Sequence, residues 1–341
     1  MEKITFAATS YRGYASEILR LRNNNRVNHQ KLDYIEWRYM GEECPYPPGI
    51  FWVYLSDMHV GMAAIVFRPY WVDGKLHYFA VLGDISLNEE MRGKGIGKKF
   101  LHFVSLQIET QSYYCSFVIP NAAVKKSLDS CGWAVPESFA WYILFVDPVS
   151  KIYDLFKTRV IADLLSKIYR FIIKMRLSLI SIEQYRIEKV KTFDESFDFL
   201  WQAYPKTGII IRDRSTASLR WRYEKHPNVK YDAIKFIRED KFIGYIVYSL
   251  QKDGCFIEDI LILETKFIKP IIKLFINEIR KNKNVAIIRA KLNINHPYAA
   301  KLDEIGFIKR IEKDVFQTFT PDKKAFAPDC KWFVTRADKD T

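Results

Sequence analysis

Three glycines follow an arginine at alternating positions in the segment Arg92–Gly97, which reads RGKGIG. The segment lies between a strand-like run that ends near Leu87 and an apolar run with helical character. Glycine lets the backbone approach a ligand without a Cβ clash, and free amides at a helix N-terminus bind phosphate or pyrophosphate. Lys94, Lys98 and Lys99 add positive charge. The pattern predicts an anion-binding strand–loop–helix unit.

The glycine spacing excludes two other phosphate-binding loops. A dinucleotide loop needs G-x-G-x-x-G, and a Walker A loop needs G-x-x-x-x-G-K-[ST]. Here the glycines are at 93, 95 and 97, so neither pattern fits. A glycine-rich turn without a ligand is the remaining alternative.

The elements around this loop indicate a mixed sheet. We expect helices over 10–40, 93–110 and 122–131, strands over 50–55, 61–67, 77–87, 113–119 and 140–146, and turns at 44–49, 56–57 and 73–74. Strands followed by a strand–helix–strand unit predict an α/β domain whose mixed sheet has a central β–loop–α unit. The strand over 140–146 is expected to close this sheet.

The second half of the chain repeats features of the first half in the same order. The paired features are the Trp-Arg-Tyr tripeptides 37–39 and 221–223, the proline loops 45–48 and 226–227, Gly61 and Gly244, the strand acids Asp84 and Glu258-Asp259, and Asn121 before Gly132 at the same spacing as Asn295 before Gly306. Five features in one order predict a duplicated domain.

Residues 151–181 differ from both halves. They carry seven Lys and Arg against two Asp, and their apolar residues recur at helical spacing. They predict a basic amphipathic helix, continuous or broken in two. We prefer a linker helix packed against both domains, and the alternative is a helix on an anionic membrane surface. The expected domains are therefore 1–150 and 182–341, joined by 151–181.

Composition limits the class of protein. The chain has 341 residues, 49% of them hydrophobic, and a net charge of +13. Residues 1–150 hold 15 basic and 15 acidic side chains, so the excess lies in the linker and the second half. That bias favours an anionic partner such as a nucleotide-linked sugar, a lipid head group or RNA, and a solvated lysine-rich surface is the alternative.

The cysteines and the N-terminus indicate a compartment. The five cysteines form no C-x-x-C pair, which predicts free thiols in a reducing compartment and no metal site. The N-terminus has no apolar signal-peptide core, and no run is long enough to span a membrane. We expect a cytoplasmic protein, with peripheral contact at the inner membrane face as the alternative that residues 151–181 leave open.

Arg92–Gly97 resembles the R/Q-x-x-G-x-G/A motif of the GNAT acyltransferase superfamily. The flanks agree, with Ile85–Leu87 ending a strand before two acids and Met91. Asn121, a short helix and Gly132-Trp133 resemble the downstream half of the family pattern. The resemblance covers nearly all of residues 1–146.

The resemblance implies an acyl-CoA donor, usually acetyl-CoA, between two splayed parallel strands. The backbone of Ile85, Ser86 and Leu87 would pair with the pantetheine arm. The remaining implied cofactor-binding residues are Arg92, Gly93, Lys94, Gly95, Ile96, Gly97, Lys98 and Asn121. The implied reaction is direct acyl transfer to a small amine, and DNA is not an expected partner.

The catalytic groups are less clear from the sequence. In many relatives a tyrosine seven residues after the asparagine serves as the general acid. This chain has Leu128 there and Leu302 at the corresponding place in the second half. Asp84 is the first candidate for the base because it shares a strand face with Ser86, and Glu89 is the second. The alternative for Asp84 is a carboxylate bonded to backbone amides. Cys115 is expected to be a core thiol.

The second half lacks the loop, since residues 263–268 read LETKFI without a glycine. We expect a degenerate copy that shapes the acceptor site, similar to tandem mycothiol synthase-like and Fem-like enzymes and to GNAT proteins of bacterial polysaccharide gene clusters. Arg38 and Arg222 in the repeated tripeptides are candidate substrate-binding residues, and pairing with buried acids is the structural interpretation we favour.

Three functions remain open. The first is acyl-CoA-dependent N-acylation of an amino sugar or its nucleotide conjugate. The second is a Fem-like transfer from aminoacyl-tRNA, for which the basic second half would suit RNA. The third is a non-catalytic acyl-CoA sensor or scaffold, which the missing tyrosine and the degenerate copy would fit.

Overall fold

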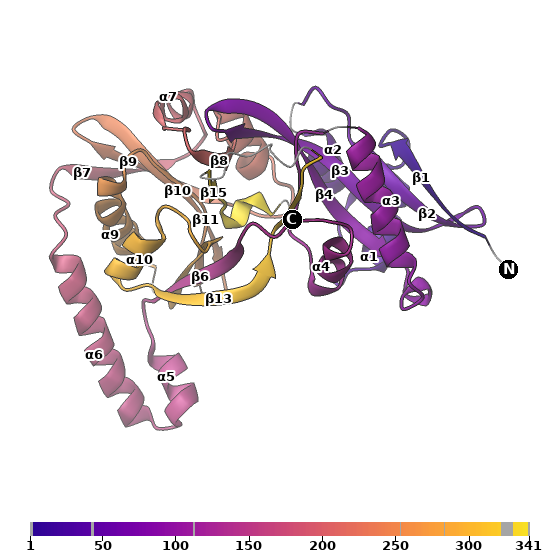
Figure 1. Ribbon diagram of the computed structural model, residues 1–341. Helices are drawn as coiled ribbons and strands as arrows, with labels where there is room; N and C mark the ends of the chain where they lie inside the picture. The colour runs from indigo at the N-terminus through magenta and orange to yellow at the C-terminus, as the bar shows by residue number, and fades with distance from the viewer. Residues whose placement is uncertain are drawn as a thin grey trace.

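The structure, a computed structural model, describes residues 3–41, 44–111, 113–252, 254–282, 284–321 and 330–339. It contains two mixed β-sheets side by side, with helices packed on each (Figure 1). The first sheet comes mainly from the first half of the chain and the second sheet mainly from the second half. The predicted fold class, two mixed α/β domains in tandem, is confirmed.

The first sheet has the strand order β1-β2-β3-β4-β5-β14, and β8 and β15 extend it from the end of β3. Its strands are β1 (Ile4–Ser10), β2 (Gly49–Leu55), β3 (Met58–Val72), β4 (Lys75–Leu87), β5 (Ser116–Val118), β8 (Ile209–Arg212), β14 (Gln317–Phe319) and β15 (Lys331–Phe333). Along β2, Trp52 and Val53 point into two different cores. The sheet is therefore buried on both faces, as its apolar sequence requires.

Two pairs of helices cover the first sheet. On one face lie α1 (Ala15–Asn24) and α2 (Leu32–Met40), and on the other lie α3 (Ile96–Thr110) and α4 (Ala122–Asp129). The 3-10 turn η1 (Glu89–Met91) leads from β4 to α3. The single helix expected over 10–40 is two helices, because the polar run after α1 breaks it and Asn25 Nδ2 caps the Leu21 carbonyl at 2.8 Å.

The second sheet has the order β13-β6-β12-β11-β10-β9-β7. Its strands are β6 (Ser138–Phe145), β7 (Tyr185–Val190), β9 (Asp232–Arg238), β10 (Lys241–Gln251), β11 (Gly254–Ile262), β12 (Ile287–Asn293) and β13 (Ile308–Val315). Its helices and turns are α7 (Ser196–Ala203), α8 (Thr216–Leu219), η2 (Arg220–Glu224, π-helical), η3 (Thr265–Phe267), α9 (Ile268–Ile279), α10 (Ala299–Ile305) and η4 (Arg336–Asp338). The parallel strands β11 and β12 flank α9 as the parallel strands β4 and β5 flank α3, which is the duplication read from the sequence.

Strands are exchanged between the two halves. The strand expected over 140–146 exists as β6, but it pairs with β12 and β13 of the second sheet. The vacant place beside β5 is taken by β14 from near the end of the chain. The expectation that this strand closes the first sheet is therefore wrong. Consecutive strands usually lie in one sheet, and chain order alone cannot reveal such an exchange.

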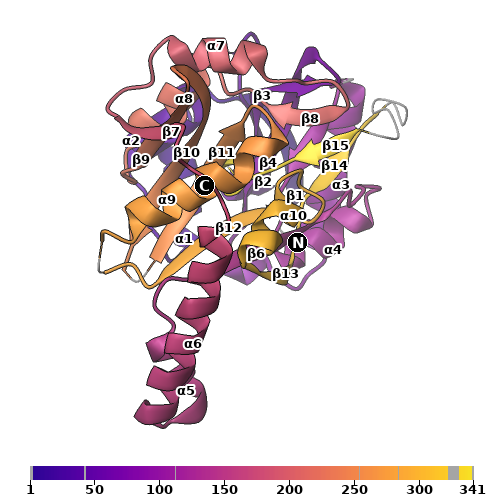
Figure 2. The ribbon, with the colours of Figure 1, turned by 90° about the vertical axis from the view of Figure 1, so that its left-hand side faces the viewer.

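The linker is a helical hairpin made of α5 (Val149–Phe156) and α6 (Arg159–Ser178), which extends away from both sheets (Figure 2). The expected amphipathic helix is thus broken in two. The expectation that it packs against both domains is wrong for most of its length, since α5 has no buried residue and α6 buries only Ala162, Ser166, Ile173 and Leu177. Within the described residues, no helix has the length and apolar character needed to cross a membrane.

The repeated tripeptides meet where the two halves touch. The rings of Trp37 and Trp221 stack with centroids 4.9 Å apart and planes 10° from parallel. Each indole donates a hydrogen bond to the main-chain carbonyl of the other residue, at 2.8 and 2.9 Å. A Cβ on Gly41 would lie 2.5 Å from Trp221 Nε1, so glycine is required there for the close approach. The two copies are therefore joined by a reciprocal, locally symmetric contact.

Replacing either tryptophan by alanine should lower the free energy of unfolding by about 3–5 kcal/mol, because each ring is buried and leaves a cavity. In the double variant the loss should fall short of the sum by about 1–2 kcal/mol, because the two side chains contact each other. Denaturant unfolding of the two single variants and the double variant measures this coupling.

The matched control is Trp133, which is buried in the core under α3 and α4 rather than at this junction. Trp37→Ala combined with Trp133→Ala should be additive within about 0.5 kcal/mol, as expected for sites that share no partner. Additivity of the Trp37 and Trp221 variants would show that the stack does not couple the halves.

Candidate functional site

The parallel strands β4 and β5 separate after a short pairing and leave a cavity between them. They pair only at Ala80 with Ser116 and at Val81 with Phe117. Beyond this point β4 continues to Leu87, and residues 118–121 turn away into α4. The cavity has a volume of about 640 Å³. Strands that splay in this way leave main-chain groups on the open edge of β4 available to a ligand.

The glycine loop closes one end of this cavity. Gly93 and Gly95 both have φ of +75°, a left-handed conformation that side chains rarely adopt. Gly95 is the N-cap of α3, and the buried Ile96 side chain anchors the helix in the core. Among the residues that the structure describes, none accepts a hydrogen bond from the main-chain N–H groups of residues 93 to 98. Unbonded amides at the start of a 15-residue helix are suited to an anion.

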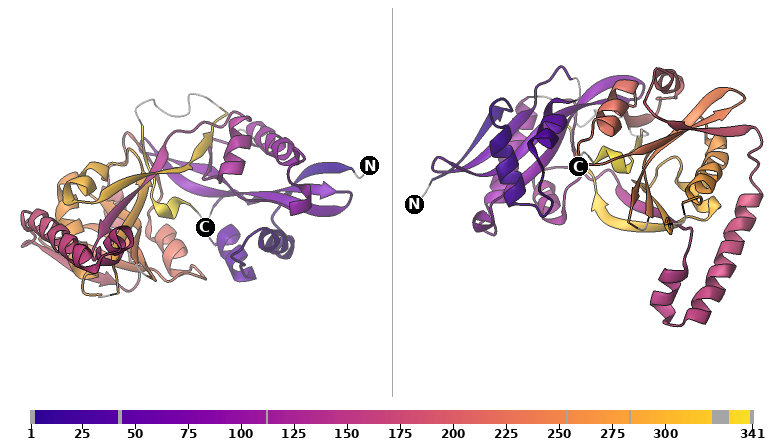
Figure 3. Two further views of the ribbon diagram at one scale, coloured as in Figure 1. Left: turned by 90° about the horizontal axis from the view of Figure 1, so that it is seen from below. Right: turned by 180° about the vertical axis from the view of Figure 1, so that it is seen from behind.

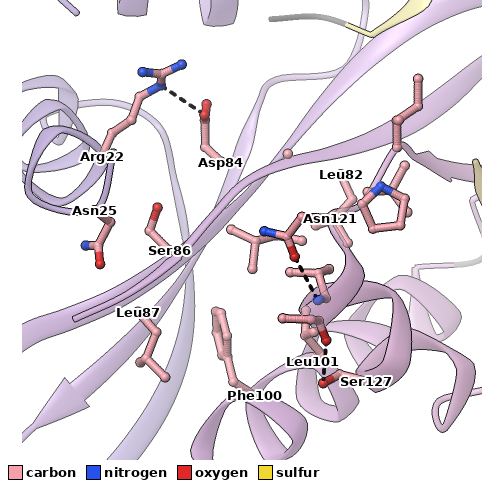
Figure 4. A pocket seen from close by; sticks show the side chains of 18 of the residues that line it. Arg22, Asn25, Leu82, Asp84, Ser86, Leu87, Phe100, Leu101, Asn121 and Ser127 are labelled. Atoms are coloured by element: carbon pink, nitrogen blue, oxygen red, sulfur yellow. Dashed lines mark hydrogen bonds and ion pairs between the residues drawn. The ribbon is translucent and has the colours of Figure 1, made fainter. Parts of the chain in front are cut away.

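The predicted donor-binding residues fall into three sets. Those that line the cavity are Ile85, Ser86, Leu87, Arg92, Gly93, Gly97 and Asn121. Lys94, Gly95 and Lys98 are exposed and do not line it, and Ile96 is buried and does not line it either. Figure 4 shows Asn121 across from β4, with its side-chain oxygen accepting from Val124 N at 3.0 Å as the N-cap of α4.

Arg92 stabilises the loop from within. Its Nε donates to the Leu87 carbonyl at 2.8 Å, and its Nη2 donates to Asn25 Oδ1 at 2.5 Å. The arginine thus ties the end of β4 to the segment after α1. Its place in the motif is explained by this bracing as well as by its charge.

Asp84 lies at a bulge in the middle of β4. Met62 pairs with Ser86 and Ala64 pairs with Gly83, so two residues of β4 face Ala63 alone. Asp84 is one of them, and its φ of +47° is uncommon for a residue other than glycine. The bulge directs its carboxylate to the face of β4 on which Ser86, Arg22 and Asn25 lie (Figure 4).

The Asp84 carboxylate is buried in a cluster of cations. It contacts Arg22 Nε at 3.1 Å, Arg38 Nε at 2.9 Å, Tyr39 Oη at 2.9 Å and Arg26 Nη2 at 3.7 Å. Burial opposes its ionisation, but the three arginines and the tyrosine outweigh burial and lower the pKa of Asp84 below its usual range. A carboxylate held in this way is a poor proton acceptor, so the interpretation of Asp84 as the base gains no support from its surroundings.

The other predicted site residues are dispersed. Glu89 is exposed in η1 and does not line the cavity. Arg38 lines the cavity, where a Cβ on Gly83 would collide with its guanidinium. Arg222 instead lines a second cavity of about 310 Å³. The two cavities share Ile119 and Lys339 as lining residues, so they adjoin.

Several residues that line the first cavity were not predicted from the sequence. They are Arg22, Asn25, Arg26, Ser127, Asp338 and Lys339. Arg22 could have been noticed, because it follows Ile18 at i+4 on the buried face of α1, where an unpaired cation is costly. Asp338 and Lys339 carry no local signal, since η4 reaches the cavity only through the tertiary fold.

The end of the first cavity that adjoins the second cavity, here called the inner end, has an excess of positive charge. Arg22, Arg26, Arg38 and Lys339 line it together with Asp84 and Asp338. Burial lowers the pKa of Arg26, Asp84 opposes this shift, and Arg22 and Arg38 add to it. Burial and then surrounding cations likewise lower the pKa of Lys339. Two cations destabilised in this way indicate a surface that an anion would stabilise.

Two buried polar atoms in the cavity have no partner. Arg22 Nη1 and Ser86 Oγ are enclosed and make no hydrogen bond with any described residue. Buried polar groups are normally paired, and unpaired ones call for an explanation such as a ligand or a bound water. Both atoms belong to residues lining the stretch of cavity between the glycine loop and the second cavity.

Leu128, Leu302 and Cys115, for which no catalytic role was expected, are buried in the core. Leu128 lies in α4 and Leu302 in α10, and neither helix contains a tyrosine. None of the five cysteines is in a disulfide, as expected, and burial raises the pKa of the Cys115 thiol well above its usual range. Among the described residues, no three His, Cys, Asp or Glu side chains gather in a way that could hold a metal ion.

The second copy replaces the loop with a compact turn. Residues 265–267 form η3, and Phe267, the N-cap of α9, is buried in the second core. An apolar side chain therefore occupies the start of α9, where the first copy has glycines. Asn295 also differs from Asn121, since α10 begins later and its N-cap is Tyr298.

No protein-family model and no curated protein matches the sequence. Solved structures are similar in fold. A conserved protein of unknown function from Enterococcus faecalis, described as a probable N-acyltransferase, has a TM-score of 0.68 at 11% identity over 96% of this chain and 74% of its own. A GCN5-related N-acetyltransferase from Anabaena variabilis has a TM-score of 0.67 at 15% identity over 94% and 74%.

Eis1 from Mycobacterium abscessus has a TM-score of 0.57 at 12% identity, over 95% of this chain and 75% of its own. All three similarities extend through both sheets, because each covers nearly the whole chain. Together with the splayed strands and the glycine loop, they show that this chain has the fold of the GCN5-related N-acetyltransferases.

Proposed function

We propose that the protein transfers an acyl group, in the simplest case acetyl, from coenzyme A to a small amine. The observation that carries the proposal is the row of unbonded amides from Gly93 to Lys98 at the mouth of the cavity between β4 and β5. Such a terminus suits a diphosphate. The open edge of β4 at Ile85–Leu87 suits an extended amide-containing arm, which would direct the thioester toward the inner end.

The reaction needs a neutral amine and an acceptor for its proton. The amine nitrogen attacks the thioester carbonyl carbon, the C–N bond forms, the C–S bond breaks, and the thiolate leaves and takes up a proton. Asp84 and Asp338 are the acids that line the cavity. Their surroundings act in opposite directions, since burial, the largest effect, raises the pKa of Asp338 whereas cations lower that of Asp84.

Asp338 is therefore the better candidate for the base, in place of Asp84 or Glu89. Its Oδ2 accepts from Thr335 N at 2.7 Å and from Thr335 Oγ1 at 3.3 Å, and Arg214 lies 3.5 Å away. These contacts hold the carboxylate at the end of η4, where it lines the inner cavity. Where two carboxyl groups in one site have pKa values shifted in opposite directions, one commonly accepts the proton and the other stabilises charge.

The acceptor is proposed to carry an anionic group. Arg22 and Arg26 line the inner end with an excess of charge, and Arg22 Nη1 has no hydrogen-bond partner among the described residues. A phosphate or carboxylate would satisfy that donor. The positive field would also lower the pKa of the acceptor ammonium, which favours the neutral amine that reacts.

A ring on the acceptor would find aromatic side chains in the adjoining cavity. The aromatic residues that line the second cavity are Trp37, Phe139, Trp141, Tyr223, His226 and Tyr231. Arg222 and Arg336 line it as well. This combination of flat apolar faces and cations supports a phosphorylated amino sugar or its nucleotide conjugate as acceptor, and with it a role in polysaccharide synthesis.

Acetyl-CoA should raise the thermal midpoint of the protein by a few degrees, because a ligand at 100 times its Kd stabilises the native state by about 2.7 kcal/mol. Gly95→Glu should abolish the shift, since it strains the left-handed N-cap and places a negative charge at the diphosphate position. Differential scanning fluorimetry measures the shift.

Gly74→Glu is the matched control. Gly74 has φ of +78° with open space around its Cβ, as Gly95 has, but it lies in the β3–β4 turn. This variant should bear the same strain and keep the ligand-induced shift. The proposal fails if the unaltered protein shows no shift with any acyl-CoA, or if both glutamate variants lose it equally.

Asp338→Asn should lower kcat by about 10²-fold at neutral pH, the lower limit for loss of a general base, with acetyl-CoA binding retained. Activity of the unaltered protein should fall as pH decreases through the raised pKa of Asp338, because protonation removes the acceptor. The variant should lose that dependence. A hydroxylamine acceptor, which is already neutral in the assay, should restore much of its rate.

Thr335→Val controls for the structural part of this effect, because it removes a hydroxyl that lies 3.3 Å from Asp338 Oδ2 and 3.1 Å from Asp259 Oδ1 and leaves the Asp338 carboxylate in place. It should lower kcat much less than Asp338→Asn does, because the group that accepts the proton is still present. Equal losses in both variants, with no restoration by hydroxylamine, would assign Asp338 a structural role only.

Arg26→Gln should raise KM for an anionic amine by about 10-fold, the equivalent of ~1.4 kcal/mol, while KM for its neutral counterpart changes little. Glucosamine 6-phosphate and glucosamine form a suitable pair. Arg20→Gln is the control, because Arg20 lies in α1, six residues before Arg26, but pairs with Glu17 and does not line the cavity. Equal effects of Arg26→Gln on both amines would refute the anionic acceptor.

A non-catalytic acyl-CoA sensor is the second candidate. It is favoured because the buried Leu128 stands where many relatives have a tyrosine that serves as the general acid. Both functions share the donor site, so the thermal shift does not separate them. Transfer of the acetyl group to any amine, dependent on Gly95, would exclude the sensor.

A further inference from the structure

The α5–α6 hairpin carries an apolar stripe that is exposed among the residues that the structure describes. Figures 1 and 3 show it extending from the second sheet, with the turn between its helices farthest from the sheets. The last turns of α6 are anchored, since Ile173 and Leu177 belong to the second core and Tyr169 Oη accepts from Phe145 N at 3.3 Å. The rest of α6 packs chiefly on α5.

The exposed apolar residues of α6 form one continuous face. They are Val160, Ile161, Leu164, Ile168, Phe171, Ile172 and Met175, and α5 adds Tyr153, Leu155 and Phe156. The spacing of three and four residues places the α6 members in one stripe of about 120° on the helix. Val160 is 76% exposed, Phe171 63% and Leu164 58%. A contiguous apolar surface of this kind on a protein marks an interaction site.

The charges beside the stripe indicate what covers it. Lys167 and Lys174 flank one edge of the stripe, and Arg176 lies beyond the other. Lys151, Lys157, Arg159 and Arg170 lie elsewhere on the hairpin, and Arg170 pairs with Asp147 at 3.7 Å. Against these seven cations the hairpin has Asp154 and Asp163, and Asp163 already pairs with Arg159 at 3.4 Å. Two copies of so basic a hairpin would repel each other, whereas an anionic surface would attract it.

We propose that this hairpin docks the protein on an anionic lipid surface. α6 would lie along the bilayer interface with Leu164, Ile168 and Phe171 among the acyl chains and its lysines at the head groups. Each basic residue near such a surface contributes attraction that salt screens. The proposal does not depend on the acyltransferase function, because it uses no residue of either cavity.

The test is co-sedimentation of the full chain with vesicles. The protein should bind vesicles of phosphatidylglycerol and phosphatidylcholine, bind pure phosphatidylcholine at least 10-fold more weakly, and dissociate as salt is raised. Leu164→Glu with Phe171→Glu should weaken binding at least 10-fold. The thermal midpoint should not fall, since both side chains are exposed in the free protein.

Phe199→Glu is the matched control, because Phe199 is 68% exposed on α7, outside the hairpin. This variant should bind vesicles as the unaltered protein does. Equal binding to neutral and anionic vesicles would overturn the proposal, as would no binding to either. Sedimentation equilibrium adds a further outcome. If the protein does not bind vesicles but forms a dimer, and the variant Leu164→Glu with Phe171→Glu is monomeric, the stripe would be a contact with a second copy of the chain.

Discussion

The contact between Trp37 and Trp221 determines how the two copies are arranged. Each indole N–H must find an acceptor once it is buried, and each finds the carbonyl of the other tryptophan. The same contact fixes the end of α2, on which Arg38 and Tyr39 reach Asp84 in β4. The position of the cavity wall thus depends on a residue 184 positions away in sequence. A change at this junction would move the inner end of the first cavity.

Strand exchange extends this dependence to the sheets themselves. β6 completes the second sheet and β14 completes the first, so each half lacks a strand without the other. Near the end of the described chain, β15 pairs with β8, and η4 follows it to the cavity, where Asp338 and Lys339 line it. The copy without the glycine loop therefore still contributes residues to the lining of the cavity.

The features that could be predicted from the sequence depend on residues that lie close together in the chain. The glycine loop, the splayed strand and the helix that follows are contiguous, and their conformations follow from residue type, as the left-handed Gly93 and Gly95 show. The repeat was also readable, because it needs only order and spacing. Asp338 and the pairing of β6 could not be inferred, because both are set by contacts between residues far apart in the chain. The role of Asp84 was ambiguous for the same reason, since its cations come from α1, α2 and the segment between them.

The duplication itself helps to separate structure from function. Each half buries an aspartate on the corresponding strand, Asp84 with arginines and Tyr39, and Asp259 with Arg214 at 3.0 Å and Tyr245 Oη at 3.0 Å. A feature kept in the copy without a donor loop is explained by folding, because a buried carboxylate needs its partners wherever it occurs. The glycine loop before α3 has no counterpart before α9, where the N-cap is the buried Phe267. Chemistry is therefore expected where the two copies differ.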